Sequence, residues 1–115
     1  MCVILRKAFG GAYIVMDSKG LGNDLCLAWP GAEIAVMGAP GAVQILHRRA
    51  DPDQRTELED DYRRRFLTPW PAAERGFVDG VIDPADTRAV LASTLAILAT
   101  KRELLSGRKH DGGPL

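Results

Sequence analysis

The stretch Arg6–Met16, RKAFGGAYIVM, places two adjacent glycines between an apolar run and a segment of helical character. Glycine in an ordered element costs up to about 1 kcal/mol relative to alanine, so the pair indicates a need for bare backbone. The first turn of a helix presents unpaired N–H groups and a partial positive charge, which suit an anionic oxygen. We therefore expect an oxyanion hole formed by the backbone N–H groups of Gly11 and Ala12. Close packing of a strand against a helix is the alternative explanation.

Strands and helices alternate along the chain, which indicates an α/β layered fold. Apolar runs and alternation predict strands at 2–5, 25–29, 32–38 and 77–82. Helical periodicity and breaker residues predict helices at 11–19, 40–49, 51–67 and 83–105, and a short helix within 68–76. The last ten residues, SGRKHDGGPL, are expected to form a loop. So few strands suggest part of a larger sheet.

Composition excludes several classes of function. The chain has 115 residues and a net charge of +0, which argues against nucleic acid or an anionic membrane surface as the main partner. No apolar stretch approaches the roughly 18 residues of a membrane span. The first residues do not resemble a secretory signal, so we expect a cytoplasmic location.

Side chains that commonly carry catalysis are sparse. Cys2 and Cys26 are expected to be reduced thiols, with a disulfide or a nucleophile as the alternatives. His47 and His110 lack the spacing of metal ligands, so no metal site is expected. No G-x-S-x-G signature is present. Any chemistry is therefore expected to use the backbone.

Three long strings carry a family resemblance. They are RKAFGGAYIVMDSKGLGNDLCLAWPGAEIAVMGAPGAVQILHRR, TPWPAAERGFVDGVIDPADTR and TKRELLSGRKHDGGPL, which together cover nearly all of the chain. They resemble the C-terminal domain of acyl-CoA carboxylase carboxyltransferase β subunits, of the propionyl-CoA and acetyl-CoA carboxylase type. The departures are Phe9, where tyrosine is common, and Gly31, where threonine is common; neither is at the expected hole.

The resemblance implies a partial crotonase-like (ClpP/crotonase) fold built of repeated ββα units. Residues 1–115 would form the C-terminal part of the carboxyltransferase C domain, with the N domain and the front of the C domain absent. In this family the N–H groups matching Gly11 and Ala12 face the biotin urea oxygen. Gly10 and Tyr13 would line the substrate site, and Ile14 would line the acyl end of the pocket, unless it is plain core.

The implied function is carboxyl transfer from carboxybiotin to propionyl-CoA or acetyl-CoA. Biotin would arrive on a partner, the biotin carboxylase and carrier α subunit, and active sites would form between subunits of a homo-oligomer. Two alternatives stay open. The chain is either a catalytically silent remnant that only associates with full-length subunits, or another crotonase-fold acyl-CoA enzyme such as a hydratase or decarboxylase. The isolated 115-residue chain is expected to be inactive, because the acyl-CoA hole is not encoded in it.

Overall fold

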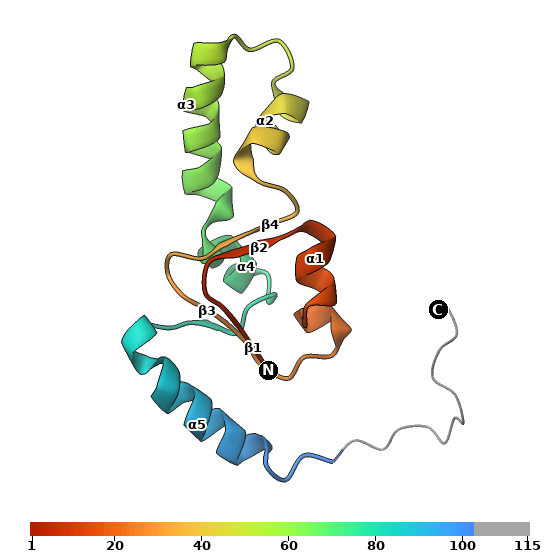
Figure 1. The fold of residues 1–115 in the computed structure, drawn as a ribbon, viewed down its shortest axis with the longest axis vertical. Helices are drawn as coiled ribbons and strands as arrows, with labels where there is room; N and C mark the ends of the chain where they lie inside the picture. The colour runs from red at the N-terminus through yellow and green to blue at the C-terminus, as the bar shows by residue number, and fades with distance from the viewer. Residues whose placement is uncertain (103–115) are drawn as a thin grey trace, which may run out of the picture. The chain divides into compact units, whose positions relative to one another are not determined.

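Two successive ββα units, implied by the resemblance, begin the chain (Figure 1). The structure is a computed structural model that describes residues 1–102. The first unit contains β1 (Cys2–Ile4), β2 (Lys7–Phe9) and α1 (Gly10–Val15). The second contains β3 (Cys26–Ala28), β4 (Glu33–Ala35) and α2 (Ala39–Leu46). The α/β class expected from the sequence is confirmed.

The two units pair strand by strand. β1 lies parallel to β3, and β2 lies parallel to β4, so each strand of the first unit meets its counterpart in the second. β5 (Gly80–Val81) adds to β3, which gives one sheet the order β1-β3-β5. A core of mostly small apolar residues lies around these strands: Ile4, Ala8, Cys26, Ala28, Ala32, Ile34, Ala72 and Val78.

The helix of the second ββα unit, α2, forms a helical hairpin with the next helix. α2 and α3 (Pro52–Tyr62) lie side by side, and α3 continues as a π-helical turn, η2, over Arg63–Leu67 (Figure 1). Asp51 caps α3, because its carboxylate accepts a hydrogen bond from the Gln54 N–H at 2.8 Å. The short helix α4 spans Pro69–Glu74. The predicted helix at 51–67 is thus found as an α-helix that ends in a π turn.

The chain also divides into two compact parts that are distinct from the ββα units: an N-terminal part, Met1–Ala85, and a C-terminal part that starts at Asp86. A 3-10 turn, η3 (Pro84–Asp86), precedes α5 (Thr87–Leu98), which belongs to the C-terminal part. The helix predicted for 83–105 therefore starts later and ends at Leu98. The predicted loop at 106–115, with His110, and the predicted helix end at Leu105 lie outside the described residues.

Two further elements differ from the sequence-based expectation. The strand β2, only three residues long, was not predicted, because it has no apolar run of its own. α1 stops at Val15 instead of residue 19, because Asp17 has a φ of 97° and leaves the helical region. A separate 3-10 turn, η1 (Lys19–Leu21), follows it.

The two cysteines, far apart in the sequence, are cross-strand neighbours. Cys2 on β1 is the register partner of Cys26 on β3, and both are free thiols. Burial, with the neighbouring Cys2, raises the pKa of Cys26 to about 11. A thiol that stays protonated at neutral pH is a poor nucleophile, so Cys26 is disfavoured as a catalytic nucleophile.

An ion pair joins the 3-10 turn η1 to the residue that precedes β5. Lys19 Nζ lies 2.7 Å from both carboxylate oxygens of Asp79, and Asp79 Oδ2 accepts from the Cys26 N–H at 2.7 Å. The Cys26 N–H bond and the Lys19 ammonium hold the pKa of Asp79 below its usual range. Asp79 therefore ties η1, β3 and the start of β5 together.

Replacing Asp79 by alanine is expected to lower the free energy of unfolding by about 1–2 kcal/mol at pH 7, since it leaves the buried Cys26 N–H without an acceptor. Because the folded pKa is depressed, the carboxylate's stabilisation is present above pH 4 and lost as the pH falls through the folded pKa. Urea unfolding at pH 7 and pH 3 tests this. Asp79→Asn is the control, because its amide oxygen keeps an acceptor. If Asp79→Ala lowers the free energy of unfolding equally at pH 7 and pH 3, the expected contribution of the charged carboxylate is contradicted.

Candidate functional site

The turn between β2 and α1 depends on Gly10. Phe9 is extended, with φ −121° and ψ 137°, and Gly10 then takes a φ of +59°, which L side chains rarely adopt. A Cβ on Gly10 would lie 3.1 Å from the backbone oxygen of Val36, which follows β4. Both conformation and space therefore require glycine at position 10. Close packing, the alternative raised for the glycine pair, explains Gly10.

Neither backbone conformation nor close packing explains the glycine at position 11. A Cβ built on it meets nothing within 4 Å, and its φ is not in the positive range. Gly11 and Ala12 are both exposed. The first four N–H groups of a helix lack partners within the helix, and the N-cap residue Phe9 makes no side-chain cap. Gly11 thus leaves open surface beside two first-turn N–H groups, the arrangement that an anionic oxygen requires.

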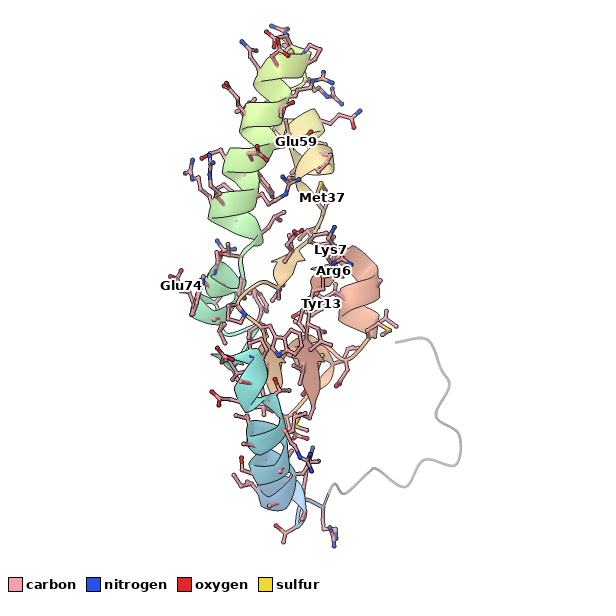
Figure 2. All side chains as sticks on the ribbon, turned by 60° about the vertical axis from the view of Figure 1, so that its left-hand side comes forward. Arg6, Lys7, Tyr13, Met37, Glu59 and Glu74 are labelled. Atoms are coloured by element: carbon pink, nitrogen blue, oxygen red, sulfur yellow. The ribbon has the colours of Figure 1, made fainter. Side chains whose placement is uncertain are left out.

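Tyr13 and Ile14 leave α1 in different directions. Tyr13 packs against the core cluster, and burial together with Cys26 raises the pKa of its phenol above the usual value (Figure 2). Ile14 is 52% exposed, so the expectation that it could be plain core is wrong for this chain. Of the two, Ile14 is the more exposed side chain, and Tyr13 is only partly buried.

Apolar side chains are unusually exposed around this turn. Val15, Met16 and Val36 are 76%, 77% and 81% exposed. Two open depressions exist elsewhere, along α2 and α3, and their linings include none of the five predicted site residues. Exposed apolar side chains therefore accompany the exposed backbone of Gly11 and Ala12.

The loop after α1 contains polar residues that sequence reasoning missed. Asp17 is the one non-glycine residue with a positive φ among residues 1–102, and Asn23 and Ser18 are buried. Asn23 bonds to both the backbone and the side chain of Asp17. The sequence carried no signal for these contacts, because the burial of Asn23 and the positive φ of Asp17 are both set by the fold.

Neither a metal site nor a membrane span is found among the described residues. Within residues 1–102, no group of three or more His, Cys, Asp or Glu side chains is arranged to hold a metal ion. In the same part of the chain, no helix has the length and apolar character needed to cross a membrane.

Comparison with known proteins agrees with the resemblance. The propionyl-CoA carboxylase carboxyltransferase subunit of Haloferax mediterranei is 54% identical over 121 aligned positions, covering 100% of this chain and 23% of the relative. The methylmalonyl-CoA carboxyltransferase 12S subunit of Propionibacterium freudenreichii subsp. shermanii is 50% identical, covering 97% and 22%. This chain thus spans about a fifth of the length of the curated relatives it matches.

A solved structure matches the fold. The transcarboxylase 12S crystal structure, described as a hexamer with methylmalonyl-coenzyme A and methylmalonic acid bound, superimposes with a TM-score of 0.88 at 50% identity. The match covers 98% of this chain and 22% of that one, and it confirms the crotonase-like fold. The model of the family described as "Carboxyl transferase domain" matches residues 1–112. The chain therefore belongs to the carboxyl transferase domain family.

Proposed function

We propose that this chain supplies the biotin side of a carboxyltransferase active site, in which a carboxyl group moves between biotin and a short-chain acyl-CoA. The observation that carries this proposal is the turn at Gly10–Ala12. Gly10 is required by its φ of +59° and its approach to Val36, whereas Gly11 is exposed with open space above it. Membership of the family supports a chemical role for this open backbone.

Two backbone donors fit the group that biotin presents. When bound, biotin would supply the carboxyl group, and its ureido oxygen would be the anionic acceptor that the two N–H groups hold. The N–H groups of Gly11 and Ala12 would donate hydrogen bonds to this oxygen, and they need no rearrangement because the turn is already formed. Such a fixed donor contributes about 3 kcal/mol to the stability of a transition state. No side-chain base from this chain is needed in this proposal.

Gly10, Tyr13 and Ile14 would support the same site. Gly10 sets the direction in which α1 leaves the strand. Tyr13 anchors α1 on the core cluster. Ile14, which is exposed, would limit the acyl group to short alkyl chains. The names of the two relatives, which refer to propionyl-CoA and methylmalonyl-CoA, favour propionyl-CoA over acetyl-CoA as the acceptor.

The proposed site needs other polypeptides. The acyl-CoA oxyanion hole would come from the N domain of another carboxyltransferase subunit, in a homo-oligomer. Biotin would arrive on a separate carrier subunit, associated with biotin carboxylase. The exposed apolar residues near Gly11 are consistent with a surface that a second polypeptide covers. A cytoplasmic location stays a prediction.

A chimera tests the function directly. This chain would replace the matching segment of the Propionibacterium 12S subunit, which is 50% identical to it. We expect the chimera to assemble and to transfer carboxyl groups between methylmalonyl-CoA and a biotin carrier within about tenfold of the parent rate. It should carboxylate propionyl-CoA faster than butyryl-CoA, because Ile14 would crowd the longer acyl chain.

The same chimera separates the alternatives. A folded oligomer without carboxyl transfer would support the silent remnant, in which this sequence only associates with complete subunits. A chimera that hydrates or decarboxylates acyl-CoA without using biotin would support another crotonase-fold enzyme. Either result would contradict the proposed function.

A further inference from the structure

We propose that Asn23 is a positioning residue for carboxyl transfer: by holding Asp17 in its positive-φ conformation, it fixes α1 and thereby the direction of the Gly11 and Ala12 N–H groups. This inference rests on the proposed function. It assigns a role to the loop between α1 and β3, whose residues do not belong to the proposed oxyanion hole.

Asn23 uses all of its amide to bridge two segments. Its Nδ2 donates to the Asp17 backbone oxygen at 2.8 Å and to Asp17 Oδ2 at 2.9 Å. Its Oδ1 accepts from the Leu25 N–H at 2.8 Å. Asn23 is only 8% exposed, so water cannot easily replace these bonds. The side chain thus connects the residue after α1 to the residue before β3.

The conformation of Asp17 needs this support. Its φ of 97° is uncommon for a residue with a Cβ, and such conformations persist only where the surroundings determine them. The two bonds from Asn23 are directed at both the backbone and the carboxylate of Asp17. Losing them would let Asp17 relax toward a negative φ, and the chain would leave α1 in a different direction.

Two backbone hydrogen bonds connect the residues beside Asp17 to α1. The Met16 N–H, next to Asp17, donates to the Ala12 carbonyl at 3.0 Å. The Ser18 N–H on the other side donates to the Ile14 carbonyl at 3.3 Å. Because α1 has only six residues, both of its ends respond to the same few bonds. A small rotation of α1 would redirect the N–H groups of its first turn.

The test uses the assembled 12S chimera with its biotin carrier. Asn23→Ala is expected to lower kcat about tenfold or more, because misplacing catalytic groups by about 1 Å costs up to about a hundredfold. The KM for acyl-CoA should change less than kcat, since the acyl-CoA oxyanion hole would come from the N domain of another subunit. Hydrogen exchange should become faster in the peptide over residues 10–16. A normal kcat, or unchanged exchange there, would overturn the proposal.

A rescue variant separates positioning from general stability. Glycine adopts a positive φ without strain, so adding Asp17→Gly to Asn23→Ala should recover a large part of kcat. If Asn23 merely stabilises the loop, the double variant would be no more active than Asn23→Ala, and the proposal fails. Gly11→Val in the same chimera tests the underlying function. If Gly11→Val loses turnover and Asn23→Ala does not, only this inference is wrong; if Gly11→Val retains turnover, the proposed function fails.

Discussion

Valine at position 11 is expected to lower carboxyl-transfer turnover about a hundredfold or more, while the protein stays folded. The side chain would stand over the open surface beside the Gly11 and Ala12 N–H groups and block an oxygen from approaching them. Removing one donor of an oxyanion hole costs about this much. The fold should tolerate the change, because a Cβ at Gly11 meets nothing within 4 Å and its φ is ordinary.

The measurement is turnover and thermal unfolding on one preparation of the 12S chimera. Gly31→Val is the matched control, because a Cβ at Gly31 also meets nothing within 4 Å, yet Gly31 is not at the proposed site. Ala12→Gly should be milder than Gly11→Val, since it keeps the N–H and only loosens the helix start. A folded Gly11→Val protein with near-normal turnover would disprove the oxyanion role.

Valine at position 10 should instead lower the stability of the fold, and turnover only as a consequence. Gly10→Val is expected to lower the free energy of unfolding by about 3 kcal/mol or more, from left-handed strain and the displacement of a packed neighbour. Gly10 has a φ of +59°, and a Cβ there would lie 3.1 Å from the Val36 backbone oxygen, which cannot rotate away. Activity should then follow the folded fraction.

Denaturant midpoints for Gly10→Val, Gly11→Val and Gly31→Val check this ordering. Gly10→Val should be far less stable than the other two, which should resemble each other. If Gly10→Val unfolds at the same denaturant concentration as Gly31→Val, the close approach of β4 to this turn is not what requires glycine at position 10.

Much of the fold was predictable, because local patterns matched its elements. Apolar runs located β1 and β3, and Asp51 followed by proline located the start of α3. The strand β2 was missed, since Lys7–Phe9 carries no pattern that distinguishes a three-residue strand from a loop. The pairing of Cys2 with Cys26 could not be predicted either, because the register of parallel strands is set by tertiary packing.

The position of the glycine turn was predictable, whereas the structural difference between its two glycines was not. The glycine pair marked the turn, yet which glycine serves the fold depends on the distance to Val36, a residue far along the chain. The role of Asn23 depends on an unusual φ at Asp17, and this conformation has no signature in the sequence. Backbone conformation set by distant contacts is what single-sequence reasoning lacks.

The pairing of each strand with its counterpart in the next ββα unit also bears on synthesis. Partner residues such as Cys2 and Cys26, or Lys7 and Glu33, are only about two dozen positions apart. Both of these ladders can therefore close once Ala35 has emerged from the ribosome, before α3 has emerged. The nascent chain can then dock the glycine turn against β4 early, and later segments add to a platform that already exists.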